Sequence, residues 1–331
     1  MPDELLVFEG ARGARLAVCR AERLSREAAL RHGLAPGSAA ALAQALAGTL
    51  LLADSDPDQA RVDLHLRCPG PVQGLLTDAD ARGAVRGLVR VTDLSRDGKA
   101  LAVVAAETSP AARLVQPVEP TVSQSTIDDP GPAEATRFDP RPLLATRHDE
   151  VAGSLSILRA LEGSGDLHRT AFPFAGADLG AALTLYLRND RPGGGEMALE
   201  VAFRSREPLA AVAGVLLSSD AEGGDDLSAL GKPLRQRILR DSLRPEEDAK
   251  ALAERIAGAL DLGPLRLRTE VRPRFSCRCS RPRVERALRI LGAVELRDMA
   301  DRDGGAEARC DFCATTYRLT RDQLLDLARA V

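Results

Sequence analysis

Aromatic side chains are scarce in this chain of 331 residues: it has no tryptophan, two tyrosines and seven phenylalanines, or 3% in all. Alanine, leucine and valine must therefore build the core, and the length allows two or three domains. The chain also lacks a strong charge of one sign, because 45 basic and 48 acidic side chains leave a formal net charge of −3. This balance argues against a general binder of polyanions.

Long apolar runs are absent as well. No window reaches the roughly 18 consecutive apolar residues that a membrane-spanning helix needs, and the nearest, residues 38–53, is interrupted by Gln44, Gly48 and Thr49. The N-terminus carries acidic residues where a secretory signal would carry basic ones. We therefore expect a cytoplasmic protein without a membrane segment. Structural disulfides are rare in that compartment, so the six cysteines are expected to be thiols or metal ligands.

Common signatures of catalysis are missing. The sequence has no G-x-x-x-x-G-K-[ST] phosphate loop, no H-E-x-x-H and no G-x-S-x-G. Its four histidines are scattered, and His65 falls on the polar side of an expected strand, which is typical of a surface residue. These absences predict that the protein is not an enzyme.

The first part of the chain alternates between helical and extended patterns. Ser25 is placed to cap a short helix that ends at Gly33, and Ser38 to cap a longer helix that runs to about Ala53. Residues 61–68 alternate apolar and polar side chains, which predicts a half-buried strand. Further extended runs are expected at 72–76, 85–91 and 101–106. Antiparallel strands joined by short turns, with two helices ahead of them, indicate an α+β domain.

Seven of the 20 prolines fall between Pro110 and Pro142, where regular apolar spacing disappears. This pattern predicts an inserted loop or linker. Structure resumes at 154–158, and residues 182–188 and 196–203 flank a glycine turn as an expected β-hairpin. We assign residues 1–207 to an α+β core with an insertion at about 108–147.

Residues 208–271 are expected to form a mostly helical linker. Pro245 suits the first turn of a helix, and the acidic residues 246–248 suit its positive end. One apolar stripe follows, made of Ala249, Leu252, Ile256 and Leu260. The linker ends in residues 265–271, which alternate as a short amphipathic strand.

Four cysteines gather in the last 60 residues as two close pairs. Cys277 and Cys279 form a C-x-C motif, and 30 residues later Cys310 and Cys313 form a C-x-x-C motif. Two close pairs of soft thiolates are what a tetrahedral zinc site requires. We therefore assign residues 272–331 to a small zinc-binding domain with one Zn²⁺ per chain.

The apolar residues of this tail are few. One helix is expected to open at Pro282 and to end at Gly292, and Thr320 with Gln323 makes a capping box for a last helix. Such a short segment needs a staple, so metal binding is expected to supply on the order of 10 to 16 kcal/mol of its folding free energy.

Free core cysteines and disulfides are the other interpretations of the motif. Three of the four residues lie among Arg and Ser rather than in apolar runs, which argues against core thiols. Two residues of extended chain span about 6.6 to 7.2 Å, at or beyond the limit for a disulfide, so a C-x-C bond requires the backbone to bend. Oxidation would expel the metal and distort the chain, a sensitivity that a purely structural site does not need.

Arginines surround the first pair. Residues 272–289 contain seven Arg and one Glu, a net charge of +6. Nearby cations favour thiolate over thiol, and so favour both metal ligation and attack by oxidants. The same arginines could instead form a solvated face, or contact nucleic acid.

Four stretches resemble the redox-regulated holdase chaperones of the 33-kilodalton heat-shock protein family. In the tail these are F-S-C-R-C-S-R-P-R-V-E-R-A-L at 275–288 and C-D-F-C-A-T-T-Y at 310–317. In the core they are L-H-L-R-C-P-G-P-V at 64–72 and A-V-R-G-L-V-R-V at 84–91. The resemblance covers most of the chain. The segment from Pro110 to Pro142 departs from it, and Cys68 stands where the family would have Gly or another small residue.

The resemblance implies a redox switch in residues 272–331. The reduced family members hold zinc through the four cysteines and are inactive. Peroxide or hypochlorite, usually with heat, joins each close pair, so the disulfides here would be Cys277–Cys279 and Cys310–Cys313. Zinc then leaves, the tail and linker unfold, and exposed apolar surface binds unfolding client proteins without ATP, commonly as a homodimer.

Two alternatives remain at this point. A zinc-ribbon protein that contacts nucleic acid through residues 272–289 would bind DNA or RNA with a steep dependence on salt. A thiol oxidoreductase would use Cys310 and Cys313, but redox C-x-x-C motifs usually open a helix, whereas a strand at 317–319 is expected to follow here. Cys19 and Cys68 are interpreted as packing residues, with Cys68 beside a proline and so open to exposure.

Overall fold

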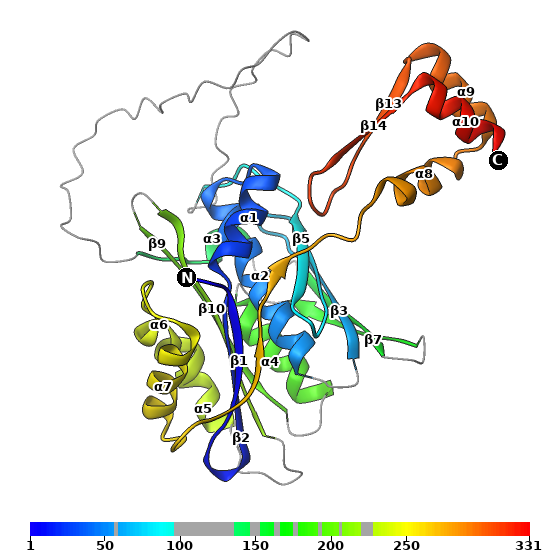
Figure 1. Cartoon of the computed structure of the whole chain (residues 1–331). Helices are drawn as coiled ribbons and strands as arrows, with labels where there is room; N and C mark the ends of the chain where they lie inside the picture. The colour runs from blue at the N-terminus through cyan, green and yellow to red at the C-terminus, as the bar shows by residue number, and fades with distance from the viewer. Residues whose placement is uncertain are drawn as a thin grey trace, which may run out of the picture.

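Two six-stranded sheets, a two-stranded hairpin and the helices around them make up the described part of the protein (Figure 1). The structure is a computed structural model, and it describes residues 1–55, 59–95, 136–145, 153–161, 166–174, 178–190, 194–204, 207–219 and 228–331. The mixed architecture confirms the α+β class expected from the sequence.

The first sheet has the order β11-β1-β2-β10-β9-β6, and every neighbouring pair in it is antiparallel. Its strands are β1 (Glu4–Glu9), β2 (Ala14–Arg20), β6 (Thr136–Arg137), β9 (Glu196–Arg204), β10 (Glu207–Ser219) and β11 (Arg266–Val271). The sheet thus joins the two ends of the core, because β11 pairs with the first strand of the chain.

The second sheet has the order β12-β5-β4-β3-β7-β8. Its strands are β3 (Gln59–Arg67), β4 (Gly74–Ala79), β5 (Ala84–Val89), β7 (Gly153–Leu161), β8 (Leu167–Phe174) and β12 (Arg274–Phe275). All pairs are antiparallel except the short one between β12 and β5. Along β3, Val62, Leu64 and Leu66 are buried, which confirms the predicted alternation.

Helix α2 (Pro36–Asp54) lies between the two sheets and forms the centre of the core. Its residues 37–53 are all buried, together with side chains of α1 (Glu22–His32), α3 (Arg141–Leu144) and α4 (Leu179–Asp190). Among the described helices, α2 alone is long and apolar enough to cross a membrane, but 94% of its apolar window is buried inside the protein. It is built as a core helix.

A group of helices covers the other face of the first sheet. These are α5 (Ser228–Pro233), the π-helical turn η2 (Leu234–Ile238), α6 (Leu239–Ser242) and α7 (Ala249–Leu260). The predicted stripe of α7 is buried in a second hydrophobic cluster with side chains of β1, β2 and β10. The linker helices therefore shield one face of the sheet.

The C-terminal unit projects from the core, with the chain end at its far tip (Figure 1). It contains α8 (Arg281–Arg289), α9 (Ala293–Arg302), α10 (Arg321–Arg329) and the hairpin of β13 (Gly305–Arg309) and β14 (Thr316–Thr320). A small separate cluster around Leu296, Leu319 and Leu324 holds these elements together. The capping box of Thr320 and Gln323 is present, as predicted.

Both N-terminal helices begin earlier than the serines predict. Helix α1 starts at Glu22, because the Asp3 carboxylate accepts hydrogen bonds from the amides of Arg23 and Leu24, each at 2.8 Å. Helix α2 starts at Pro36, and the Ser38 hydroxyl donates to the carbonyl of Val91 instead of capping. A cap from a distant segment leaves no local signal in the sequence.

The predicted hairpin at 182–188 and 196–203 is wrong in its first half. Residues 179–190 form the helix α4, which buries Leu183, Tyr186 and Leu187 and leaves Leu185 half-exposed. The short run 182–188 alternates like a strand, and only the longer spacing back to Leu179 shows the helical period. The second half is correct, because residues 196–204 form β9.

The linker and the insertion also differ from expectation. Residues 208–271 begin in β10 and end in β11, both strands of the first sheet, so only their middle is helical. Pro245 precedes α7 rather than opening it, because the Asp248 carboxylate caps the helix at Ala251. The strand expected at 101–106 and most of the proline-rich stretch lie outside the described residues. The end of that stretch contains β6 and α3 rather than an irregular loop.

Candidate metal centre

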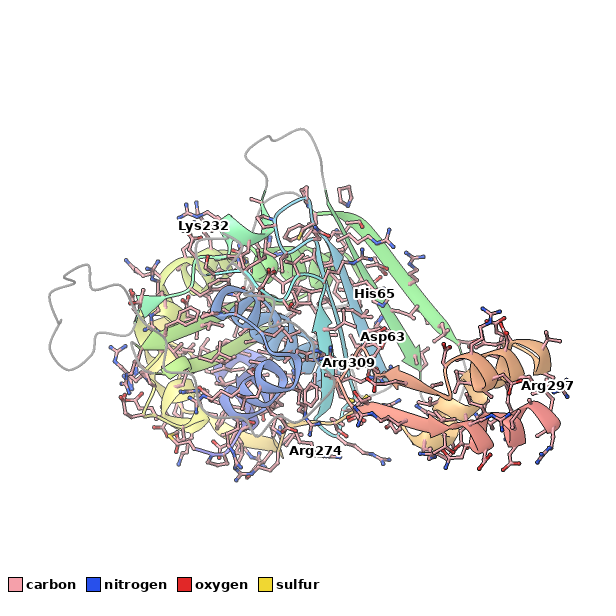
Figure 2. The ribbon with its side chains drawn as sticks, turned by 90° about the horizontal axis from the view of Figure 1, so that it is seen from above. Asp63, His65, Lys232, Arg274, Arg297 and Arg309 are labelled. Carbon is pink, nitrogen blue, oxygen red and sulfur yellow. The ribbon has the colours of Figure 1, made fainter. Side chains whose placement is uncertain are left out.

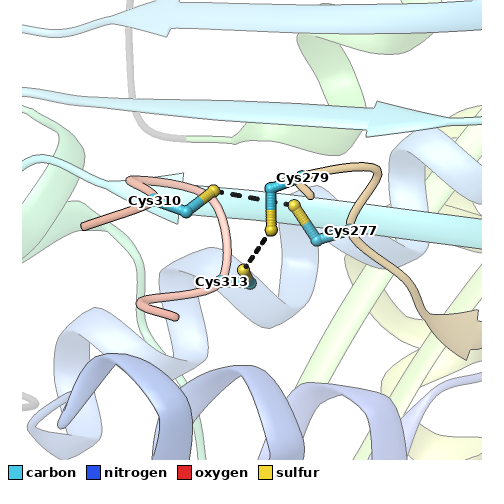
Figure 3. Close-up of side chains that lie close together, drawn as sticks. All are labelled: Cys277, Cys279, Cys310 and Cys313. Carbon is cyan, nitrogen blue, oxygen red and sulfur yellow. Dashed lines mark hydrogen bonds between the residues drawn. The ribbon is translucent and has the colours of Figure 1, made fainter. Parts of the chain in front are cut away.

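All four C-terminal cysteines converge at one point. Their sulfur atoms lie within 4.8 Å of one another, although the two motifs are separated by 30 residues (Figure 3). The Sγ atoms of Cys277 and Cys310 are 3.7 Å apart, and those of Cys279 and Cys313 are 3.3 Å apart. Both motifs therefore contribute to a single site, as the spacing predicts.

This spacing fits a zinc ion. Zinc–thiolate bonds of about 2.3 Å directed at the corners of a tetrahedron place neighbouring sulfurs about 3.8 Å apart. The two measured separations are close to that edge length, and four thiolates are a common donor set for structural zinc. The residues present could thus hold one zinc ion without a further ligand.

The local backbone positions the two cysteines of each motif close together. Cys277 and Cys279 follow directly after β12, whereas Cys310 and Cys313 form the tight turn between β13 and β14. In that turn the Ala314 amide donates to the Cys310 carbonyl at 2.8 Å, and Ala314 adopts a left-handed φ of 57°. The turn points both of its sulfurs toward the C-x-C segment.

The environments of the sulfurs differ. Burial raises the pKa of the Cys310 thiol to about 12, although amide hydrogen bonds from Phe312 and Cys313 oppose it. Burial also raises the pKa of Cys313, but hydrogen bonds with the side chain and backbone of Thr315 and with neighbouring thiols outweigh it, and the result is about 7. The hydroxyl of Tyr317 donates to Cys279 Sγ at 3.0 Å. Cys313 is therefore the more easily ionised sulfur of the C-x-x-C pair.

The site is docked on the edge of the second sheet. Backbone bonds from Arg274 to Gly83 and from Ser276 to Val85, both 2.8 Å, continue the sheet into the C-x-C segment. Cys313 is 3% exposed and belongs to the main core cluster, with the other three cysteines packed against it. Arg309, next to Cys310, lies at this junction, whereas Arg297 lies at the distal end of the unit (Figure 2).

Three side chains make contacts at this junction that the sequence does not predict. The Arg86 guanidinium lies 4.1 Å from the ring centroid of Phe312, and its Nη1 is 3.7 Å from Cys277 Sγ. His32 Nε2 lies 3.1 Å from the carbonyl oxygen of Phe312, and burial lowers the pKa of this histidine. Arg86 is about 190 residues from Cys277, and His32 is 280 residues from Phe312. No local sequence motif predicts contacts between segments so far apart.

Three of the seven arginines of 272–289 form ion pairs. Arg272 pairs with Glu4, Arg278 pairs with Asp80, and Arg281 pairs with Glu285. The first two pairs join the ends of the C-x-C segment to the core, and the third lies within α8. These pairs lower the positive charge that the segment could offer to a nucleic-acid backbone.

The remaining sequence candidates lie away from the metal centre. Cys19 and Cys68 are buried in the core, which confirms that they are packing residues. His65 is exposed on the outer side of β3, as expected for a surface residue (Figure 2).

Comparisons with known proteins agree with this architecture. A sequence profile of the "Hsp33 protein" family matches residues 3–320. A 33 kDa chaperonin of a Cyanothece species is 31% identical over 334 residues, which cover 99% of this chain and 97% of that protein. A 33 kDa chaperonin of a Synechocystis species is also 31% identical, over 99% and 96% of the two chains. The crystal structure of the Thermotoga maritima 33 kDa chaperonin superposes with a TM-score of 0.69 at 17% identity, over 100% of this chain and 99% of that one.

Proposed function

The chain belongs to the Hsp33 family, and from this membership we propose that it is a redox-regulated, ATP-independent holdase chaperone. The observation that carries the proposal is the convergence of Cys277, Cys279, Cys310 and Cys313 on one site that is docked on the core. Its curated relatives are named chaperonins, which supports a role in binding unfolded proteins rather than catalysis.

In the reduced protein the four cysteines would hold one Zn²⁺. When bound, the ion supplies four bonds that join the two cysteine loops, on the order of 10 to 16 kcal/mol of folding free energy. The small cluster around Leu296 and Leu324 has few members to replace that contribution. Residues 272–331 would therefore be the redox-switch domain, folded and docked only while the four sulfurs are thiolates.

Oxidation would convert each close pair to a disulfide, Cys277–Cys279 and Cys310–Cys313. A thiolate attacks the O–O bond of a peroxide to give a sulfenic acid and water or hydroxide. The second thiolate of the pair then displaces hydroxide from that sulfur and forms the S–S bond. For each disulfide formed, the pair of thiolates passes two electrons to one peroxide, and the two hydroxides released take up two protons to become water. A disulfide is neutral, so its sulfurs can no longer bind the metal as thiolates do.

The consequence would be exposure of apolar surface. Cys313 and Phe275 pack on the core, and the stripe of α7 covers the first sheet. Once the tail and linker unfold, these faces would bind unfolding client proteins in the cytoplasm, with the oxidised chain as a homodimer. Such a holdase needs no nucleotide, because exposed surface alone supplies the driving force.

The test follows zinc and client aggregation together. Reduced protein should contain one zinc ion per chain and should not protect a heat-denatured client. Peroxide at elevated temperature should release the zinc to a chromogenic chelator and suppress aggregation over the same time course. Equal suppression of aggregation by reduced and oxidised protein would contradict the redox switch and indicate a constitutive chaperone. No suppression in either state would remove the chaperone itself.

A further inference from the structure

The guanidinium of Arg86 lies between the core and both cysteine loops. On the core side its Nε and Nη2 donate to Asp78 Oδ2 at 2.9 and 2.7 Å. On the other side its Nη1 lies 3.7 Å from Cys277 Sγ, and its Cζ lies over the ring of Phe312, 4.1 Å from the ring centroid. Cys277 belongs to the C-x-C loop and Phe312 to the C-x-x-C loop, so one side chain contacts both.

Water has little access to the contacts of Arg86, so the charged groups there interact strongly. The side chains of Arg86 and Asp78 are 13% and 5% exposed. Asp78 also pairs with Arg61, which has a second partner in Asp63 at 3.1 Å. Two arginines therefore share the carboxylate of Asp78, and the sulfur of Cys277 lies within reach of Arg86 as a second acceptor. Charge-assisted and cation–π contacts are strongest where water is excluded.

We infer that Arg86 is a positioning residue through which the charge of the four-sulfur site holds the C-terminal unit on the core. The inference rests on the proposed function, because it requires Cys277 to be a thiolate in one state and a neutral disulfide in the other. In the disulfide, Arg86 loses an anionic acceptor, and the docking contact weakens. The remaining contacts of the C-x-C segment, such as the short pairing of β12 with β5, do not change with the charge of the sulfur.

The test compares Arg86→Gln with Arg67→Gln in the full-length protein. Arg67 is an exposed arginine on β3 of the same sheet, so its replacement removes the same charge without touching the site. Reduced, zinc-loaded Arg86→Gln should retain one zinc per chain. Backbone amides of residues 274–276 and 84–89 should exchange hydrogen for deuterium about tenfold faster than in the parent protein. Arg67→Gln should exchange like the parent, and Arg86→Lys should fall between the two.

Hydrogen exchange after oxidation distinguishes this role from a purely structural one. In the peroxide-treated protein the parent and Arg86→Gln should exchange equally at these amides, because the contact is already lost. Phe312→Leu removes the ring side of the contact and leaves the core untouched, so it should reproduce the faster exchange if Arg86→Gln folds poorly. Parent-like exchange in both zinc-loaded variants would overturn the inference, as would an effect that persists unchanged after oxidation. Exchange needs no client, so a missing holdase activity alongside these shifts would count against the proposed function alone.

Discussion

The six cysteines fall into two groups by location: Cys19 and Cys68 are buried in the core, whereas the other four lie on two loops of the C-terminal unit. Burial raises the pKa of Cys68 to about 11 and places that of Cys19 well above its usual range, with nearby carboxylates adding to the effect at Cys19. Cysteine reacts as the thiolate, so neither residue should compete with the metal centre for oxidants.

This difference predicts a stoichiometry. Treatment of the reduced protein with a zinc chelator at pH 7.5 should unfold the C-terminal unit and end the burial of its four thiols. These four should then be alkylated quickly by iodoacetamide, whereas Cys19 and Cys68, still buried in the core, should react at least about 100-fold more slowly. Peptide mass spectrometry over a time course measures each site. Full denaturation should make all six react, which serves as the control. Rapid labelling of Cys68 in folded protein would contradict the packing role.

Glu200 makes stability depend on pH. Burial raises the pKa of its carboxyl from 4.5 to about 7, although Arg137 and Arg240 oppose the shift. A carboxyl with a raised pKa in the folded state contributes most below its unfolded pKa. Its contribution is lost as the pH rises from about 4.5 to about 7, since the unfolded state then binds fewer protons. The loss amounts to about 3 kcal/mol at most.

Glu200→Gln should remove this dependence. The variant should match the parent near pH 4.5 and exceed its free energy of unfolding by about 1 to 3 kcal/mol at pH 8. Urea denaturation at both pH values measures the difference. Glu254→Gln, on the exposed side of α7, is the control and should change neither value. Parallel pH profiles for Glu200→Gln and the parent would show that the carboxyl ionises freely.

Local sequence patterns predict those features of a helix or strand that depend on neighbouring residues. The alternation of β3, the stripe of α7 and the capping box of α10 were predicted because each depends on residues a few positions apart. The N-terminus of α1 was misplaced because Asp3, about 20 residues away, satisfies its amides. Helix α4 was mistaken for a strand because a run of seven residues is too short to separate the two periods.

Helix α7 offers a test of the linker. Leu252 is fully buried against the first sheet, so Leu252→Ala should weaken the docking of this helix by about 2 to 5 kcal/mol. Trypsin should then cleave after Arg255 markedly faster in the reduced, zinc-loaded protein. Lys250→Ala on the exposed face of the same helix is the control and should leave that cleavage rate unchanged. Unchanged cleavage in Leu252→Ala would mean that α7 is held by other contacts.

The convergence of the four cysteines could be predicted from the sequence, and the docking of their site on the core could not. Four cysteines in two close pairs carry their chemistry in their spacing, and the fold brings their sulfurs within 4.8 Å. The contacts of Arg86 and His32 with the Phe312 loop join segments far apart in the chain, and they follow from the tertiary fold alone. A single sequence therefore predicts which cysteines come together more readily than it predicts which surface of the core they dock on.

Metal removal should therefore affect the two parts of the molecule differently. The main core has its own large hydrophobic cluster around α2, whereas the C-terminal unit has a small one that does not include the cysteines. Chelation of zinc from reduced protein should unfold residues 272–331 without oxidant and leave the core intact. Cys313→Ser should do the same without chelator, because Cys313 would be a ligand of the proposed zinc ion and also packs on the core.

Two measurements on the same samples distinguish these parts. Amides of α8, α9 and α10 should lose their protection from hydrogen exchange, since about 10 kcal/mol or more of metal-linked stability exceeds what six buried side chains replace. The calorimetric transition of the core should keep its midpoint within a few degrees. Cys68→Ser serves as the matched control, because it replaces a cysteine that lies away from the metal centre and should leave the helices of the tail protected. Persistent protection of α9 and α10 after chelation would show that the Leu296 cluster folds the unit by itself, and that the metal determines docking alone.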